Sequence, residues 1–130
     1  MKQLMVPDEK GRGFARAVRA GQFLFLSGMT GQWDLQTWER DERSLGNVEY
    51  QVRRIFEWAD QVLAKCGLGM KDVVRTVTYI RSMSDLPAIG RVKHEFFPSA
   101  DVTDSTIAAA GFVGTADLEI EFLAVYPDGQ

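Results

Sequence analysis

The sequence predicts an α+β fold, a mixed β-sheet that carries two helices on one of its faces. Two segments with apolar residues at helical spacing, one long and one shorter, lie among short segments with the character of strands. The predicted order of the elements is ββαβαββ, which favours two helices packed on the same face of the sheet. The chain has 130 residues, a length typical of one domain with its own core. We therefore expect a single domain over residues 1–130.

The first part of the chain predicts two strands followed by a long loop. A polar lead-in, a strand of alternating polarity, an apolar strand and a polar, turn-rich loop are expected at residues 1–12, 14–18, 22–27 and 28–46, respectively. The loop contains Trp33 and Trp38 and could include a short hairpin. These two tryptophans either form a lid over a small apolar ligand or pack the loop, and packing is the favoured interpretation.

A long helix that begins near Val48 is the clearest predicted element. Apolar residues recur at helical spacing over about five turns, at Val48, Val52, Ile55, Phe56, Ala59, Val62 and Leu63. Gly67 follows the last of them, as is typical of the carboxyl end of a helix. Residues 73–80 are rich in valine, threonine and tyrosine and predict the next strand.

A second helix is predicted after this strand. We expect Ser84 to cap it, because a hydroxyl group suits the unsatisfied amides of a first turn. Pro87 is tolerated within that first turn, and Pro98 ends the helix. Two final strands are expected at residues 104–112 and 117–126.

The last predicted strand is apolar on both faces over part of its length. One face carries only apolar residues, namely Leu118, Ile120, Phe122, Ala124 and Tyr126. The other face begins with Glu119 and Glu121 but continues with Leu123 and Val125. A strand of this kind usually has something covering each face. Because the two helices can cover only one face, we expect a partner subunit to cover the other.

The charge and hydropathy of the chain disfavour several classes of protein. The net charge is −3, and the 15 lysines and arginines are spread along the chain without forming a basic tract that would bind nucleic acid. Apolar runs such as residues 23–26 are too short to cross a bilayer. Residues 1–10 lack the apolar core of a signal peptide. We therefore expect a cytoplasmic protein that binds neither nucleic acid nor membrane.

The sequence also disfavours a metal site and a phosphate-binding loop. Cys66 and His94 are the single cysteine and the single histidine, so an internal disulfide is excluded and a zinc site of the usual kind is not expected. Gly11-x-Gly13 is too short, and lies in the wrong context, to bind phosphate. No metal and no cofactor are expected.

Several short motifs follow one another along the chain. They are Phe25-Leu26-Ser27-Gly28, Cys66-Gly67-Leu68 with Asp72-Val73-Val74, Ser84-Asp85-Leu86 with Glu95-Phe96-Phe97, Thr103-Asp104-Ser105-Thr106-Ile107, Gly111-Phe112-Val113-Gly114 and Asp117-Leu118-Glu119-Ile120-Glu121. In this order and spacing they resemble the Rid family (the YjgF or L-PSP proteins), small trimeric deaminases of enamines and imines. The resemblance extends from about Phe14 to Val125. It implies a chorismate-mutase-like fold and a homotrimer with a central β-barrel and small-molecule pockets between subunits.

The resemblance further implies the positions of the site residues. The family's pocket has a tyrosine at the position of Phe14, a serine-glycine pair at Ser27 and Gly28, and an asparagine at Gly90. It has an arginine at the position of Asp104, a binding backbone amide at Thr106 and a glutamate at Glu119. Three side chains differ from the family pattern, since the hydroxyl, the amide and the guanidinium groups are missing at Phe14, Gly90 and Asp104. The glutamate that positions the hydrolytic water is retained as Glu119.

Glu119 is the expected catalytic residue. Deamination of an imine needs attack of water on carbon and protonation of the departing nitrogen, and one carboxyl group with a raised pKa can serve both steps. The alternative is a solvent-facing glutamate paired with Arg75 or Arg81. A pocket position is favoured because the same strand face becomes apolar at Leu123 and Val125.

Asp104 lies where the family has the cation that binds a substrate carboxylate. It is either a turn residue that bonds the local backbone or a pocket residue opposite Glu119. In the second case the two carboxyl groups repel each other, and one of them should hold its proton near neutral pH. Arg12, Arg16 and Arg91 are candidates to replace the missing cation, although such arginines are usually solvated.

These observations predict a hydrolase that deaminates a small imine, enamine or related reactive metabolite, with Glu119 directing water. Because Asp104 replaces the arginine, the substrate is expected to be neutral or cationic at that end, and efficient deamination of 2-aminoacrylate is not expected. Ser27 is expected either to hydrogen-bond a ligand or to satisfy the end of its strand. The alternative function is a non-catalytic trimer that binds small metabolites. Nuclease activity, also attributed to the family, is disfavoured by the acidic charge and the lack of a histidine cluster.

Overall fold

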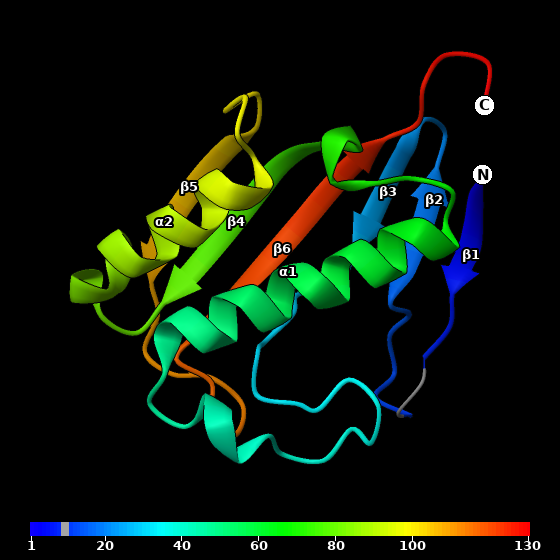
Figure 1. Ribbon diagram of the computed structural model, residues 1–130. Helices are drawn as coiled ribbons and strands as arrows, with labels where there is room; N and C mark the ends of the chain where they lie inside the picture. Colours follow the sequence, from blue (N-terminus) through cyan, green and yellow to red (C-terminus); the bar gives the residue numbers. More distant parts are fainter. Residues whose placement is uncertain (9–10) are drawn as a thin grey trace.

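The computed structural model describes residues 1–8 and 11–130. Within this part of the chain, six strands form one sheet in the order β1-β2-β3-β6-β4-β5 (Figure 1). The strands are β1 (Lys2–Val6), β2 (Ala17–Ala20), β3 (Phe23–Leu26), β4 (Val73–Ile80), β5 (Thr103–Ala108) and β6 (Leu118–Val125). Strands β4 and β5 are parallel and the other pairs are antiparallel, so the sheet is mixed, as predicted.

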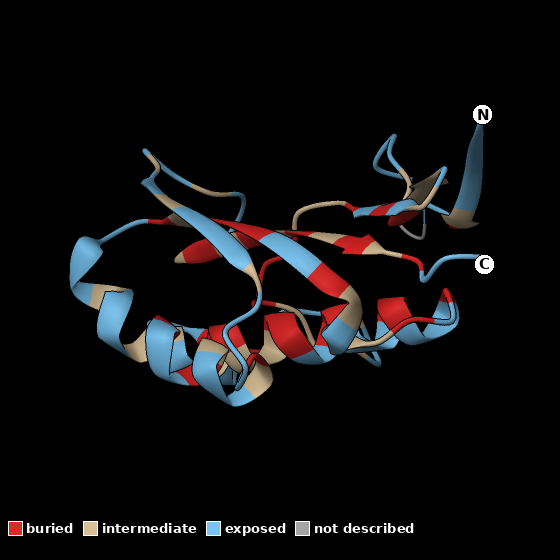
Figure 2. Cartoon of the chain, turned by 90° about the horizontal axis from the view of Figure 1, so that it is seen from above, coloured by how far each residue is buried: buried red, intermediate tan, exposed pale blue. Residues whose placement is uncertain are grey.

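Two helices cover one face of this sheet. They are α1 (Val48–Lys65), which crosses the middle of the sheet, and α2 (Leu86–Phe96), which lies over β4 and β5 (Figure 1). The core lies between the two layers, and the opposite face of the sheet carries no helix (Figure 2). The ring of Phe56 on α1 lies at its centre, 5.5 Å from that of Phe122 on β6 and 4.6 Å from that of Phe96 on α2. The predicted arrangement of two helices on one face of a mixed sheet is confirmed.

Both helices begin close to their predicted positions, but the cap of α2 is not the predicted one. Asn47 caps α1 by accepting a hydrogen bond from the amide of Tyr50 at 3.1 Å. The prediction that Ser84 caps α2 is wrong. A short 3₁₀ turn (Met83–Asp85) leads directly into the helix, and no side-chain hydrogen bond caps the first turn of α2. The hydroxyl of Ser84 instead lies 2.7 Å from that of Ser82.

The amino-terminal strand β1 was not predicted. It pairs antiparallel with β2 at the edge of the sheet. Residues 2–4 of it are exposed and Val6 at its end is buried in the core, so its sequence shows no alternation of buried and exposed residues. Residues 9 and 10 of the predicted lead-in lie outside the described residues. The neighbouring strand β2 begins at Ala17 and not at Phe14.

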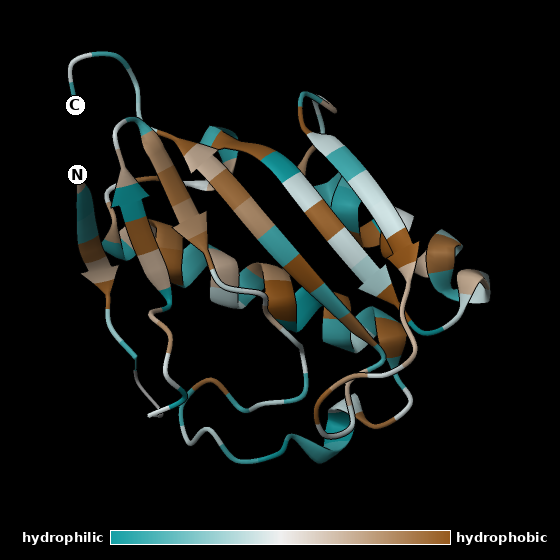
Figure 3. Cartoon of the chain, turned by 180° about the vertical axis from the view of Figure 1, so that it is seen from behind, coloured by the Kyte–Doolittle hydropathy of each residue, from teal (hydrophilic) through white to brown (hydrophobic). Residues whose placement is uncertain are grey.

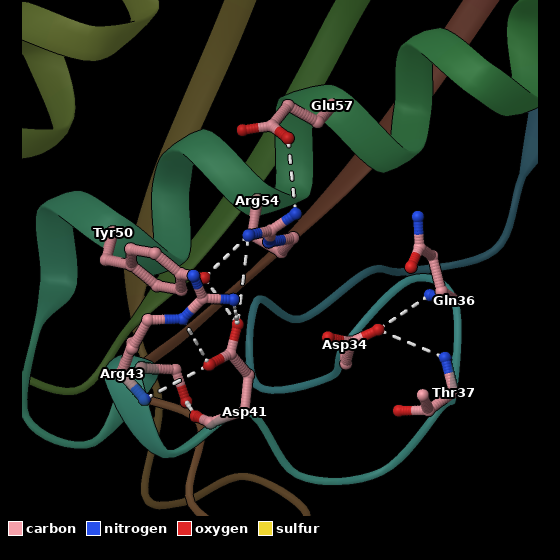
Figure 4. A network of polar contacts seen from close by, with 9 residues as sticks. Asp34, Gln36, Thr37, Asp41, Arg43, Tyr50, Arg54 and Glu57 are labelled. Carbon is pink, nitrogen blue, oxygen red and sulfur yellow. Dashed lines mark hydrogen bonds and ion pairs between the residues drawn. The ribbon is translucent and has the colours of Figure 1, made fainter.

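Buried polar contacts fix the long loop between β3 and α1 against the helix (Figure 4). Asp41 of the loop is 6% exposed and accepts hydrogen bonds from Nε of Arg43 at 2.9 Å and from the hydroxyl of Tyr50. The bonds from Arg43 are the main reason that the pKa of Asp41 falls to about 2. Arg54 of α1 lies 3.8 Å from the same carboxylate. These contacts hold the loop in one position beside the sheet. The short hairpin expected within the loop is a single β-bridge between Trp33 and Arg40.

Among the described residues, no helix has the length and hydropathy needed to cross a membrane. These residues also contain no group of three or more histidine, cysteine, aspartate or glutamate side chains that could hold a metal ion.

Candidate active site

A cavity of about 430 Å³ lies beside the start of β6. Its lining comes from residues 12–14, the loop after β3, α1 and the loop before β6, and it includes Phe14, Gly28, Trp33 and Glu119. A second and more open groove of about 670 Å³ is lined by Tyr79, Ala109, Gly111, Phe112, Val113, Glu119 and Glu121. Glu119 and Val113 belong to both linings, so the Glu119 carboxyl group lies at the junction of two hollows.

The alternation of β6 places Glu119 there. Its neighbours Leu118 and Ile120 are fully buried against the helices, so the Glu119 side chain points to the opposite face of the sheet. The chain after β3 lies beside it, because Met29 and Ile120 exchange backbone hydrogen bonds of 2.9 and 3.0 Å. This pairing brings Gly28 against the Glu119 carboxyl group, where a Cβ atom would lie 2.4 Å from Oε2.

The environment of Glu119 raises its pKa. Burial is the main cause, the negative charge of Glu121 adds to it, and the positive charge of Arg16 acts in the opposite direction. Glu121 itself accepts a hydrogen bond from the hydroxyl of Tyr79 at 2.9 Å. Of the two arginines considered as partners of Glu119, Arg81 lies 3.3 Å from the Asp117 carboxylate. Glu119 thus has the environment of a carboxyl group that holds its proton to a higher pH than a free carboxyl group does.

Arg16 and Ser27 build the floor beneath this region. Arg16 is buried, and its Nη1 donates hydrogen bonds to the carbonyl oxygens of Gly28 at 3.1 Å and Ser27 at 3.4 Å. Its guanidinium group also lies 4.3 Å from the ring of Trp58. The Ser27 hydroxyl donates to the carbonyl oxygen of Ala15 at 2.7 Å, which satisfies the end of the strand. Both side chains therefore support the chain around Gly28.

Gln32 is a site residue that sequence reasoning missed. It is 1% exposed, and its Nε2 donates to Thr30 Oγ1 at 2.9 Å and to the carbonyl oxygen of Val113 at 3.0 Å. Its Oε1 accepts from the amide of Thr115 at 2.9 Å. One amide group therefore ties together the two loops that face each other across the cavity. A glutamine within a polar loop carries no sequence signal of this role.

Asp104 belongs to a separate cluster of polar groups between β4, β5 and α2. Its carboxylate accepts hydrogen bonds from the hydroxyl groups of Thr76 at 2.7 Å, Thr78 at 2.8 Å and Thr106 at 2.6 Å. Nζ of Lys93 on α2 lies 2.9 Å from the same group. Burial alone would raise the pKa of Asp104, but the bonds from Thr106, Lys93, Thr76 and Thr78 lower it to about 2. Asp104 is therefore an ionised and well-partnered carboxylate.

Asp104 and Glu119 lie on opposite faces of the sheet within one chain. Asp104 shares a face with Thr78, whose hydroxyl it binds, whereas Glu121, on the face of Glu119, binds the hydroxyl of Tyr79. Thr78 and Tyr79 are consecutive in β4, and consecutive strand residues point to opposite faces. The expected pair of carboxyl groups facing each other is therefore absent within the chain.

The residues expected in one site thus form two groups. Phe14, Gly28 and Glu119 line the cavity, whereas Asp104 and Thr106 lie together on the helix side of β5. Gly90 lies on α2, with open space where a Cβ atom would be. On the same helix, Arg91 lies 3.9 Å from Glu49, whereas Arg12 lines the cavity that contains Glu119.

Comparisons with known proteins place the chain in a family. The model of the family described as endoribonuclease L-PSP matches residues 9–126. The chain is 32% identical over 112 residues to a 2-iminobutanoate/2-iminopropanoate deaminase from Dermatophagoides farinae, with 86% of this chain and 84% of that protein covered. It is 27% identical over 85 residues to the 3-aminoacrylate deaminase RutC from Acinetobacter baylyi, with 65% and 64% covered.

Solved structures share the fold. RidA from an Antarctic Psychrobacter species matches with a TM-score of 0.81 and 21% identity over 95% of each chain. A member of the YjgF/YER057c/UK114 family from Mycobacterium tuberculosis matches with a TM-score of 0.79 and 23% identity, over 96% of this chain and 99% of that one. The fold, the order of the motifs and the match over residues 9–126 lead to one conclusion: this chain belongs to the L-PSP family, which includes the YjgF and Rid proteins.

Proposed function

We propose that this protein hydrolyses the carbon–nitrogen double bond of a small imine and releases ammonia. The observation that carries the proposal is the Glu119 carboxyl group, which lies against Gly28 in the wall of a cavity with its pKa raised by burial. The similarity to the imine deaminase from Dermatophagoides farinae supports the same reaction class. An enamine would enter the reaction as its imine tautomer.

The reaction needs one group that exchanges protons at two atoms. In the first step, ionised Glu119 takes a proton from water while the water oxygen forms a bond to the imine carbon, and Glu119 passes this proton to the nitrogen, which gives a carbinolamine. In the second step, Glu119 takes the proton of the carbinolamine hydroxyl and delivers it to the nitrogen as the carbon–nitrogen bond breaks, so ammonia leaves, the hydroxyl becomes a carbonyl and Glu119 is ionised again. The sum is imine plus water to carbonyl compound plus ammonia. A carboxyl group whose pKa is raised above its ordinary value is suited to both steps, because it is a better proton acceptor than a free carboxylate and can return the proton it takes.

We further propose a single domain that assembles as a homotrimer through the helix-free face of the sheet. This face carries Phe23 and Phe25 of β3, which are 48% and 50% exposed and pair with Val125 and Leu123 of β6 (Figure 3). Exposed aromatic groups beside these half-buried aliphatic groups favour burial against another copy. The division of the predicted site residues between two faces supports the same assembly, because residues on opposite faces can share one pocket only when different copies contribute them.

The charge of Asp104 does not decide the substrate. The expectation of a neutral or cationic substrate assumed a carboxylate that acts on the ligand with its full charge. In the structure, Lys93 lies 2.9 Å from Asp104 and three hydroxyl groups bind the same carboxylate. The local charge is thereby largely balanced, and an anionic substrate meets no net repulsion from this cluster.

Ammonia release from freshly generated 2-iminopropanoate, with and without protein, tests the proposed reaction. Glu119→Gln keeps the shape of the side chain and removes its acid–base function, so turnover should fall by at least about 100-fold. Glu39→Gln, an exposed loop glutamate, is the matched control and should keep full activity. Binding of imino or oxo acids without any acceleration by the wild type would contradict hydrolysis and support the alternative of a non-catalytic binding protein.

A further inference from the structure

The turn before β2 holds one arginine in a defined place. Arg12 lies between Gly11 and Gly13, whose φ angles of +63° and +90° belong to the left-handed region that glycine adopts without strain. The carboxylate of Asp8 accepts hydrogen bonds from the backbone amides of Arg12 at 2.9 Å and Gly13 at 2.7 Å. The Gly-Arg-Gly sequence is therefore a built turn, and its backbone geometry sets where the Arg12 side chain starts.

The Arg12 side chain leads from this turn into the cavity of Glu119. It is part of the lining of the 430 Å³ cavity, together with Phe14 and Trp33. Its guanidinium carbon lies 5.6 Å from the centre of the Trp33 ring, a distance at which an aromatic face attracts a cation. An arginine held over an aromatic ring keeps its edge available to bind a planar anion through two parallel hydrogen bonds.

The charges around Glu119 distinguish the two hollows that meet there. The more open groove contains Glu121, whose charge repels an anion. The cavity contains Arg12, whereas the guanidinium group of Arg16 is bonded to the carbonyl oxygens of Ser27 and Gly28 beneath it. A negatively charged group that enters the site is therefore directed to the Arg12 side of Glu119.

We propose that Arg12 binds the carboxylate of the substrate, a small 2-imino acid, while Glu119 acts on the adjacent imine carbon. The proposal rests on the function proposed above and specifies its substrate class. It assigns the missing cation to a turn before β2 of the same chain. Lys93 on α2, contributed by another copy, is the competing cation, but its charge is already paired with Asp104 at 2.9 Å.

Binding of an unreactive product-like acid tests the proposal without turnover. The probes are 2-oxobutanoate and its uncharged amide, titrated calorimetrically into the wild type and into variants with unchanged circular dichroism spectra. Arg12→Gln should weaken 2-oxobutanoate about 10- to 100-fold, the value of a hydrogen-bonded charge, and should leave the amide unchanged. Arg12→Lys keeps the charge but loses the planar fork, so it should fall between the two. Lys65→Gln, which removes an exposed cation at the end of α1, is the matched control and should alter neither probe.

Two kinds of result would overturn the proposal. The first is equal binding of 2-oxobutanoate by Arg12→Gln and the wild type, or no binding of this acid by the wild type. The second is a loss of binding in Lys93→Gln but not in Arg12→Gln, which would assign the cation to α2. In turnover assays, Arg12→Gln should raise KM for the imino acid by the same 10- to 100-fold and change kcat less. If binding depends on Arg12 but no variant or wild type accelerates hydrolysis, the anion site stands and the proposed reaction fails.

Discussion

The carboxyl group of Glu119 occupies the space that a side chain at residue 28 would need. A Cβ atom built on Gly28 would lie 2.4 Å from Glu119 Oε2 and 2.9 Å from its Cδ. Gly28 does not have a positive φ angle, so the backbone does not require glycine at this position. The close approach of the carboxyl group is what excludes a side chain there.

Gly28→Ala should therefore reduce activity more than stability. The added methyl group meets the flexible end of Glu119, so the carboxyl group moves while the strand stays in place. A displacement of about 1 Å can cost about 100-fold in rate, so kcat should fall by about 10- to 100-fold. Steady-state kinetics and thermal unfolding of the same samples measure the two effects. Gly69→Ala is the control, because nothing lies within 4 Å of its Cβ position. Wild-type kcat in Gly28→Ala would show that the position of Glu119 does not limit turnover.

Asp104→Asn should destabilise the protein at neutral pH and cost less in acid. The pKa of Asp104 falls from 3.8 to about 2 on folding. A depressed carboxyl pKa stabilises the fold above the unfolded value of 3.8, and this contribution is lost as the pH falls through 2. The loss at pH 7 should be about 1–2 kcal/mol after allowance for partial exposure.

Urea unfolding of the wild type and Asp104→Asn at pH 7 and at about pH 2.5 measures the stability cost of the substitution at each pH. At the lower pH most of the contribution of the Asp104 carboxylate is gone. Asp101→Asn, at an exposed position in the loop before β5, serves as the control and should change stability little at either pH. An equal cost of Asp104→Asn at both pH values would mean that its ionised form is not what the threonines and Lys93 stabilise.

Asp41→Asn should destabilise the fold, by about 2 kcal/mol. The Asp41 side chain is 4% exposed, and the substitution removes the carboxylate that Arg43 and Tyr50 bind. Arg54, in contrast, keeps Glu57 at 3.3 Å. Because this network anchors the loop that carries Trp33, binding to the cavity should weaken as well. Chemical denaturation of the variant measures the first effect.

Glu95→Gln is the comparison for Asp41→Asn. It removes an ion pair with Arg53 in which both side chains are well exposed, so it should change stability little. If the two substitutions cost the same, burial of Asp41 would not be the source of its contribution.

The sequence predicted those helices and strands in which buried residues recur at a regular spacing. The buried face of α1 and the alternation of β6 both appear as regular apolar spacing, because one side of each element packs on the core. The same alternation predicted that Glu119 leaves the core face. Strand β1 was not predicted because residues 2–4 are exposed at the edge of the sheet and Val6 at its end is the buried residue, so no alternation of buried and exposed residues marks the strand.

The sequence could name site residues only where local periodicity or a motif places them. Glu119, Gly28 and Phe14, which were named in this way, line one cavity, and their roles in binding and catalysis stay predictions. Gln32 was missed and Arg12 was only one of three candidates, because their roles depend on how a loop or a turn folds back on the sheet.

By itself, the sequence determined the family, the two-layer arrangement and the outward direction of Glu119, because repeated short-range patterns specify each of them. Only the tertiary structure decided that Asp104 is bound by Lys93 on the far face of the sheet and that Arg12 lies in the cavity of Glu119. Both facts depend on contacts between groups from separate elements, and the free energy of such contacts is set by distances that no local pattern encodes.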